Sequence, residues 1–143
     1  TLENESVYAP VILDGAHCDY AAARLAYKLK QDKFFLISDA AFLGRKVSNF
    51  KWENFDAHLE NGFYRNKEGN LAGASISMKE AVQNAFNHLN VSADEAIKMA
   101  TCRVASAINM DNQLGKIKSG FPASFTTFND NLSRIEALNY NQI

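Results

Sequence analysis

The chain has 143 residues, of which 47% are hydrophobic, and its 15 basic and 16 acidic residues give a formal net charge of -1. This composition fits one ordinary globular domain with a sizeable core and excludes a disordered chain. The charges are interspersed, which argues against a nucleic-acid or membrane-surface binder and favours a small, neutral or modestly charged ligand.

The sequence also lacks the features of secreted and membrane proteins. Its two cysteines, Cys18 and Cys102, form no CxxC pair, so they indicate neither a zinc knuckle nor a disulfide scaffold. No apolar run reaches the roughly 20 residues that cross a bilayer, and residues 1–5 lack the charged and apolar regions of a signal peptide. We therefore expect a cytoplasmic protein with reduced thiols and with neither a nucleic-acid nor a membrane partner.

The first part of the chain predicts a β-α-β unit with parallel strands. An apolar run over 8–13 and a second one over 33–38 have the pattern of buried strands. Between them, Asp19 can cap a helix over 20–30. Two strands joined by a helix pair in parallel.

Both apolar runs are hydrophobic on both faces, as strands are when neighbouring elements cover both sides of a sheet. Two such strands cannot satisfy their own outer edges, and open edges expose a chain to aggregation. We infer that these residues belong to a longer polypeptide or to a composite assembly.

The middle of the chain predicts β-hairpins and then two capped helices. Residues 41–74 alternate between polar and apolar types, with turn sequences at Glu60-Asn61-Gly62 and Lys67-Glu68-Gly69-Asn70. Ser77 with Glu80, and Ser92 with Glu95, match the capping box that opens an amphipathic helix. The apolar positions expected to be buried are Ala81, Val82, Ala85, Phe86 and Leu89 in the first helix and Ala96, Ile97 and Ala100 in the second.

The pattern of apolar and polar residues changes after Asn109, and we place a domain boundary near Asp111. Leu114-Gly115-Lys116-Ile117 and residues 124–128, separated by a turn at Gly120, suggest short antiparallel strands.

The residues most suggestive of chemistry follow the two predicted strands. Asp14 and His17 come after the first strand, and Asp39 comes directly after the second. In parallel β/α architectures, ligands and catalytic groups collect where strands end. An acidic residue at such an edge can serve as a general base. The alternative is that Asp39 caps a loop and that His17 hydrogen-bonds locally.

Other candidate residues favour structural roles. His58 and His88 have no carboxylate or histidine at ligand spacing, and His88 suits the C-terminal end of a helix. Cys18 beside His17 suggests a cysteine nucleophile, but adjacent side chains usually point apart at a turn, and we discount that role.

Five motifs resemble those of a known family. The chain is similar, over nearly its whole length, to the N-acetylglucosamine-6-phosphate deacetylases of the amidohydrolase superfamily. The motifs occur in the family's order and approximate spacing: Asp14-Gly15-Ala16-His17-Cys18-Asp19, Leu36-Ile37-Ser38-Asp39-Ala40, Gly69-Asn70-Leu71-Ala72-Gly73-Ala74, Ala96-Ile97-Lys98-Met99-Ala100-Thr101 and Leu114-Gly115-Lys116-Ile117. One stretch, 120–124, departs from the commoner Gly-Lys-x-Ala-Asp pattern.

The resemblance implies an α/β fold, with this chain as the C-terminal part of a (β/α)8 amidohydrolase barrel plus a segment of a small β-sandwich. Residues 1–110 would supply the last two barrel strands and helices of the catalytic barrel, with a β-hairpin insertion near 42–74. Residues 111–143 would belong to the small β-sandwich.

The activity that the resemblance implies is metal-dependent hydrolysis of N-acetylglucosamine 6-phosphate to glucosamine 6-phosphate and acetate, an amino-sugar reaction carried out by the full-length parent. Asp39 would be the catalytic general base and then acid, acting on a water bound to a divalent metal, zinc or iron. The substrate-binding residues would be Asp14, Gly15, Ala16, His17, Leu71, Ala72 and Gly73.

The family's metal ligands, a glutamate and two histidines, lie upstream of this chain. No metal ligand is therefore expected here, and the isolated chain is expected to bind no metal and to be inactive. The parent would be a homo-oligomer, a dimer or larger, whose only other partner is the small amino-sugar phosphate.

Two further hypotheses stay open. The parent could be another amidohydrolase that acts on a different N-acyl sugar or on a cyclic amide. Alternatively, the chain could be a noncatalytic module that self-associates across its open sheet edges.

Overall fold

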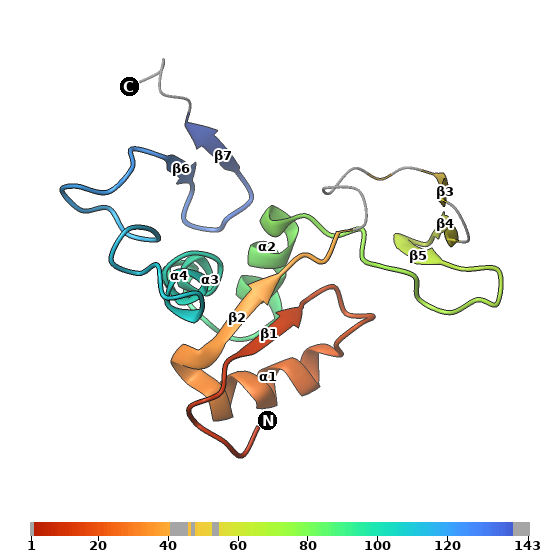
Figure 1. Ribbon diagram of the computed structural model, residues 1–143, viewed down its shortest axis with the longest axis horizontal. Coiled ribbons are helices and arrows are strands. Elements are labelled where there is room, and N and C mark those ends of the chain that lie inside the picture. The colour runs from red at the N-terminus through yellow and green to blue at the C-terminus, as the bar shows by residue number, and fades with distance from the viewer. Residues whose placement is uncertain (1, 41–45, 47, 53–54, 139–143) are drawn as a thin grey trace.

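The structure, a computed structural model, describes residues 2–40, 46, 48–52 and 55–138 (Figure 1). Its first part is a β-α-β unit made of β1 (Ala9–Ile12), α1 (Tyr20–Lys30), the 3-10 turn η1 (Gln31–Lys33) and β2 (Phe34–Ile37). The two strands pair in parallel. The Asp19 side chain accepts hydrogen bonds from two backbone N–H groups in the first turn of α1. Both the β-α-β unit and its helix cap are therefore confirmed.

Three further helices follow: α2 (Met78–His88), α3 (Ala93–Ala100) and α4 (Cys102–Ala107). The capping box that opens α2 is complete, because Ser77 Oγ accepts from the Glu80 N–H and the Glu80 carboxylate accepts from the Ser77 N–H. At α3 only the first half of the expected box is present. Ser92 Oγ accepts from the Glu95 N–H, but the Glu95 carboxylate accepts instead from Tyr27 and Arg103.

The main core lies against one face of the β1–β2 sheet. Phe34 and Leu36 alternate along β2, so they share a face, and both are buried. Helices α1, α2 and α3 complete this core with Ala23, Ala81, Ala85, Leu89, Ala96 and Met99. The most buried large side chain of α3 is therefore Met99, whereas Ile97 and Ala100 are only half-buried.

The opposite face of the sheet is less covered. Pro10 is exposed, and Phe35 and Ile37 are only half-buried. Within the described residues, then, only one face of these two strands is fully covered.

A buried arginine ties the helices to β2. Arg103 is 6% exposed, and its guanidinium donates to the Glu95 carboxylate, to Asp32 Oδ1 at 3.0 Å and to the Phe34 carbonyl at 3.4 Å. Burial alone would lower the pKa of Arg103, but the hydrogen bond and charge of Glu95, followed by those of Asp32, outweigh burial and raise it. The guanidinium therefore stays charged inside the core.

A separate antiparallel sheet consists of β3 (Asn49–Trp52), β4 (Phe55–Glu60) and β5 (Phe63–Arg65). It lies to the side of the helices (Figure 1). The β4–β5 turn has positive φ at both Asn61 and Gly62, 51° and 87°, as a two-residue hairpin turn requires. A second turn over 66–70 leads to the bridge between Arg65 and Leu71. Both predicted turns are confirmed, and residues 41–45, 47 and 53–54 of the predicted hairpin region lie outside the described residues.

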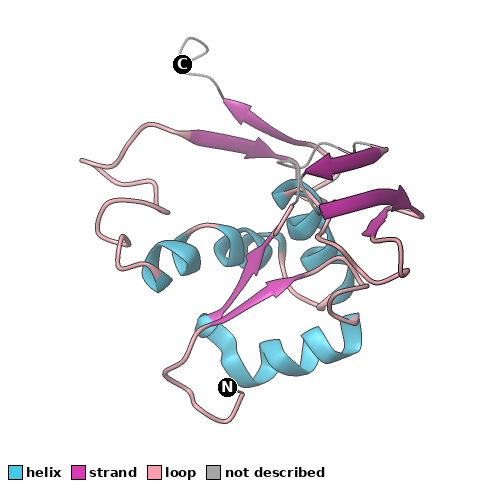
Figure 2. Ribbon diagram, turned by 45° about the vertical axis from the view of Figure 1, so that its right-hand side comes forward, coloured by secondary structure: helices cyan, strands magenta, loops and turns pink. Residues whose placement is uncertain are grey.

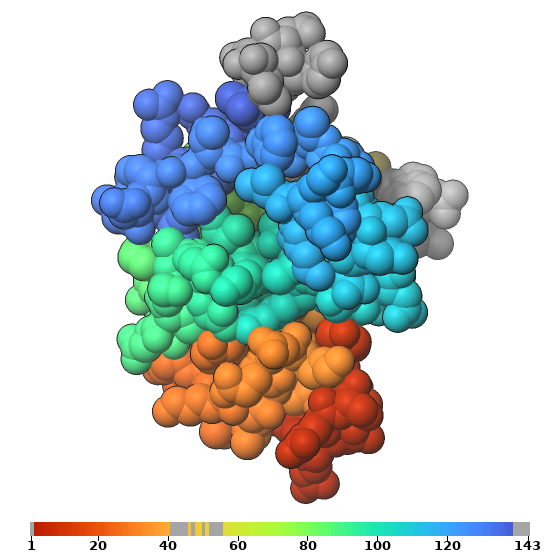
Figure 3. Space-filling model, turned by 90° about the vertical axis from the view of Figure 1, so that its left-hand side faces the viewer, coloured from red at the N-terminus to blue at the C-terminus, as the bar shows by residue number. Residues whose placement is uncertain are grey.

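The C-terminal segment forms a hairpin of β6 (Phe125–Phe128) and β7 (Ile135–Leu138). It lies beyond α2–α4 from β1 and β2 (Figures 2 and 3). Leu132, in the turn between the strands, is fully buried in the main core, and the Gln83 amide donates to its carbonyl. The hairpin is thus anchored to α2.

The predicted strand at Leu114–Ile117 is wrong. Ile117 is 88% exposed, and Gly115 packs its backbone on the start of α4, where an added Cβ would lie 2.8 Å from the Cys102 Cα. This segment therefore forms a loop held by close backbone packing rather than by a strand partner. None of the helices in the described part of the chain is long and apolar enough to cross a membrane.

Candidate functional site

The two parallel strands bring the predicted site residues to one edge of the sheet. Ile12, the last residue of β1, pairs with Ile37, the last residue of β2. Asp14 and Asp39 each follow two residues later, so both lie beyond the same, C-terminal, edge of the pair. We call this region the strand-end edge.

Asp14 organises the turn that carries His17. Its Oδ1 accepts from the Ala16 N–H at 2.9 Å and from the His17 N–H at 2.8 Å. Its Oδ2 lies 2.7 Å from His17 Nδ1. The Asp14 side chain is only 6% exposed, whereas the His17 side chain is 20% exposed. The local hydrogen bond that was considered for His17 is therefore present, and it leaves the ring partly accessible.

Gly15 allows this turn to approach α1 closely. Its φ is +81°, and an added Cβ would lie 2.9 Å from two ring carbons of Tyr20. The Tyr20 ring is itself stacked on His88, with 3.9 Å between ring centroids and 12° between the planes. His88 thus has a packing role, in keeping with the structural interpretation. Its ring packs on Tyr20, and the Tyr20 ring in turn lies against Gly15.

Asn84 also holds the turn, and sequence reasoning missed it. Its Nδ2 donates to the Leu13 carbonyl at 2.8 Å, which ties the end of β1 to α2. The available signal was its position next to Ala85 and three residues after Ala81, both buried. A polar side chain on a buried helix face needs a hydrogen-bond partner.

Asp39 lies in a strained backbone conformation at the end of β2. It is exposed, and its φ of 45° is in the left-handed region that non-glycine residues rarely adopt. Its carbonyl accepts from the Ala74 N–H at 3.3 Å, and Ala40 forms a parallel bridge with Ala74. The backbone of Asp39 is thus held by the segment that follows the second predicted substrate-binding motif.

The second predicted substrate-binding motif, residues 71–73, is connected to the strand-end edge through the contacts of Ala74 with Asp39 and Ala40. Leu71 is exposed and Ala72 is buried, and the Ala72 N–H donates to the Tyr64 carbonyl at 2.9 Å. Gly73 follows with φ +89°, directly before Ala74. Gly73 therefore directly precedes the residue that binds the Asp39 backbone. Leu71 instead bridges to Arg65 through its backbone, and Ala72 packs in the small core of the β3–β5 sheet.

Two other candidates lack the environment of catalytic groups. Burial, then the negative charges of Asp19 and Asp14, raises the pKa of the Cys18 thiol, which disfavours the nucleophilic thiolate. His58 lies in β4 with Glu60 Oε2 at 3.9 Å, a loose and exposed pair.

The described residues do not form a metal site. No group of three or more histidine, cysteine, aspartate or glutamate side chains among them could hold a metal ion. The Asp14 carboxylate, the most buried acidic group at the strand-end edge, already accepts three hydrogen bonds within its own turn.

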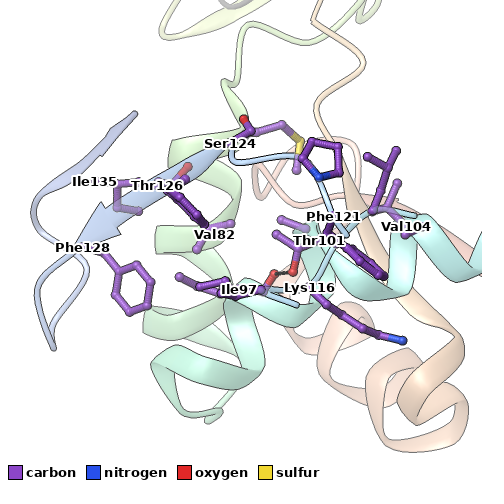
Figure 4. A pocket seen from close by; sticks show the side chains of 18 of the residues that line it. Val82, Ile97, Thr101, Val104, Lys116, Phe121, Ser124, Thr126, Phe128 and Ile135 are labelled. Carbon is purple, nitrogen blue, oxygen red and sulfur yellow. Dashed lines mark hydrogen bonds between the residues drawn. The ribbon is translucent and has the colours of Figure 1, made fainter. Parts of the chain in front are cut away.

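A separate cavity of about 640 Å³ lies between α2–α4 and the loop that leads into β6 (Figure 4). Its walls are mainly apolar and include Val82, Ile97, Val104 and Phe121. The described residues that line it include none of the predicted site residues. The cavity therefore belongs to the contact between the helices and the C-terminal segment, not to the strand-end edge.

Comparison with known proteins gives consistent matches. The chain is 30% identical over 131 residues to the N-acetylglucosamine-6-phosphate deacetylase of Haemophilus influenzae, which covers 90% of this chain and 34% of that protein. It is 32% identical over 129 residues to the N-acetylgalactosamine-6-phosphate deacetylase of Shewanella sp. (strain ANA-3), covering 89% of this chain and 32% of that protein. The chain thus spans about a third of the length of these relatives.

Solved structures of proteins with the same name also match this chain. The crystal structure of N-acetylglucosamine-6-phosphate deacetylase from Pasteurella multocida matches 96% of this chain and 35% of its own, with a TM-score of 0.85 and 33% identity. The enzyme of the same name from Thermotoga maritima matches with a TM-score of 0.83 at 22% identity, which supports the fold alone. The sequence profile of the Amidohydrolase family matches residues 16–142. The chain therefore belongs to the amidohydrolase family.

Proposed function

We propose that the protein to which this chain belongs removes the acetyl group of an N-acetylated amino-sugar phosphate, with N-acetylglucosamine 6-phosphate as its substrate. The observation that carries the proposal is the strand-end edge, where parallel pairing brings the Asp14–His17 turn and Asp39 together. Similarity to deacetylases from Haemophilus influenzae and Pasteurella multocida supports the substrate class.

The fold of the complete protein is part of the same proposal. In it, β1 and β2 are the last two strands of a (β/α)8 barrel, and residues 111–143 belong to a small β-sandwich. Two observations support this arrangement: one sheet face is half-exposed, and the chain spans about a third of its relatives. Neighbouring barrel strands would pair with the outer edges of β1 and β2.

The reaction needs a group that moves protons at the acetamide. Hydrolysis adds water to the carbonyl carbon, breaks the C–N bond and releases acetate and an amine. The Asp39 carboxylate takes a proton from the attacking water and delivers a proton to the departing nitrogen, because an amide nitrogen leaves poorly unless it is protonated. His17, with its accessible ring, binds the sugar phosphate.

Members of the amidohydrolase superfamily generally use a divalent metal. Because the described residues do not form a metal site, we place the ligands for zinc or iron in the part of the relatives that this chain does not span. The complete protein is proposed to be a cytoplasmic homo-oligomer.

The test is Asp39→Asn in the complete polypeptide, measured by release of acetate from N-acetylglucosamine 6-phosphate. Asparagine tolerates the left-handed backbone, so the fold should persist while turnover falls to a few per cent of wild type or less. Asp130→Asn, an exposed aspartate in the β6–β7 turn, is the matched control and should retain full activity. Retained turnover in Asp39→Asn would disprove its role.

A second candidate substrate is the epimer N-acetylgalactosamine 6-phosphate. The 32% identity to the Shewanella protein, which is named for that substrate, favours testing it. Initial rates on the two phosphorylated epimers and on unphosphorylated N-acetylglucosamine distinguish the candidates. Equal rates with and without the phosphate would favour an amidohydrolase acting on a different N-acyl compound.

A further inference from the structure

We propose that Asp14 is a positioning residue, which holds the His17 ring so that Nε2 accepts a hydrogen bond from a hydroxyl group of the amino-sugar phosphate. This inference rests on the proposed function and adds a role within it. It differs from the expectation that Asp14 itself binds the substrate. The structure shows a carboxylate that is turned inward and accepts three hydrogen bonds within its own turn.

The first step of the argument is the accessibility of the carboxylate. The Asp14 side chain is 6% exposed, compared with 20% for His17, although the two lie in the same turn. Its two oxygens already accept from the Ala16 N–H, from the His17 N–H and at His17 Nδ1, at 2.9, 2.8 and 2.7 Å. An ionised carboxylate offers about four acceptor positions. Little of this carboxylate is left for a ligand.

The second step is the assignment of the ring nitrogens. An ionised carboxylate only accepts hydrogen bonds, so His17 Nδ1 carries the proton that points at Asp14 Oδ2. The other ring nitrogen, Nε2, then carries no proton, so it can accept a hydrogen bond from a hydroxyl group of the ligand. In sites of this kind, the partner of one histidine nitrogen sets what the other can do.

The third step is the rigidity of the turn. Asn84 holds the Leu13 carbonyl on one side, and Tyr20, stacked on His88, lies directly against Gly15 on the other. The backbone of the turn therefore has supports that do not depend on Asp14 Oδ2. What Oδ2 alone controls is the His17 ring.

The experiment uses Asp14→Asn in the complete polypeptide. The asparagine carbonyl oxygen can still accept from the two backbone N–H groups, so the turn is kept. Its NH2 group replaces Oδ2 and donates to Nδ1, which forces the ring proton onto Nε2, so that Nε2 can no longer accept from the substrate hydroxyl. The matched control is Asp19→Asn, because Asp19 caps α1 in the same segment and asparagine is an equally good N-cap.

We expect KM for N-acetylglucosamine 6-phosphate to rise about tenfold or more in Asp14→Asn, in line with losses at other supports of functional histidines. The kcat should change by less than about twofold, because the affected group binds substrate rather than moving protons. Asp19→Asn should leave both constants unchanged. An unchanged KM in a folded Asp14→Asn protein would overturn the inference.

A double-mutant cycle separates positioning from direct binding. In a His17→Ala background, Asp14→Asn should change kcat/KM by less than about twofold, because contacts that act through one group are not additive. Multiplicative effects of the two substitutions would mean that Asp14 acts without His17, and would overturn the inference.

If Asp14→Asn does not fold, ¹⁵N NMR of the histidines in the wild-type protein still decides the point. A ring with a proton on Nδ1 and none on Nε2 supports the inference, and any proton on Nε2 overturns it. Failure of the proposed function is distinguishable, because the wild-type protein would then release no acetate at all.

Discussion

Replacing Gly15 with alanine tests whether the turn at the strand-end edge is pinned against α1. The backbone cost comes first: φ is +81° at Gly15 and +82° at Gly69. An alanine in this left-handed region costs about 1–2 kcal/mol at either position. Gly69 has no atom within 4 Å of an added Cβ, so Gly69→Ala measures the backbone cost alone.

At Gly15 the added Cβ meets the Tyr20 ring at 2.9 Å. The ring cannot move away freely, because it is stacked on His88 with 3.9 Å between centroids. Overpacking of this kind costs about a further 1–3 kcal/mol. We therefore expect Gly15→Ala to lower the free energy of unfolding by roughly 2–5 kcal/mol, well beyond the loss in Gly69→Ala.

The assay is urea unfolding followed by circular dichroism, comparing transition midpoints at a shared slope. A third variant isolates the clash: in a Tyr20→Ala background, Gly15→Ala should cost no more than Gly69→Ala does in the wild-type background. Equal losses for the two glycine variants in the wild-type background would refute the reasoning, because the ring would then yield at no cost.

Three further predictions concern stability. Glu95→Gln should cost about 3 kcal/mol in urea unfolding, because it removes a partner of the buried arginine, while Glu136→Gln, in an exposed pair, should leave the unfolding midpoint nearly unchanged. Gly115→Ala, whose Cβ would meet the backbone at the start of α4, should lower the melting temperature well below that of Gly120→Ala, where an added Cβ meets nothing within 4 Å. Burial acts to raise the pKa of Glu80, but hydrogen bonds from a lysine and from its capping box outweigh burial and lower that pKa. A lowered carboxylate pKa contributes stability above the unfolded value near ~4.3 that is lost as pH falls through the folded pKa, so Glu80→Gln should flatten the acid-side loss in unfolding midpoints measured from about pH 5 to 3.

The local features of the fold were predictable where the signal lies within a few residues. The helix cap at Asp19, the complete capping box at Ser77 and the Asn61-Gly62 turn each depend on neighbours in the chain, and the structure contains all three. The second capping box failed in part because distant groups, Tyr27 and Arg103, compete for the Glu95 carboxylate. Such competition is set by tertiary packing.

In the candidate site, too, some features were predictable from the sequence and others depend on tertiary packing. Parallel strands place their C-terminal ends at one edge, so the position of the Asp14 turn and Asp39 beyond the same edge of β1 and β2 followed from topology. The contact between Asn84 and Leu13 joins residues 71 positions apart, and the stacking of Tyr20 on His88 also links distant segments. No local pattern identifies the partners in these contacts. The roles of the individual site residues stay predictions.

The left-handed backbone at Asp39 affects how the phenotypes of substitutions at this position must be interpreted. Most side chains raise the energy of that conformation, whereas asparagine and glycine tolerate it. In a saturation library, most variants at Asp39 will therefore lose the carboxylate and also strain the backbone. Their phenotypes will combine a loss of stability with any loss of activity. Under the proposed role of Asp39, a homologue with asparagine or glycine here would keep the loop conformation but lack the group that transfers protons.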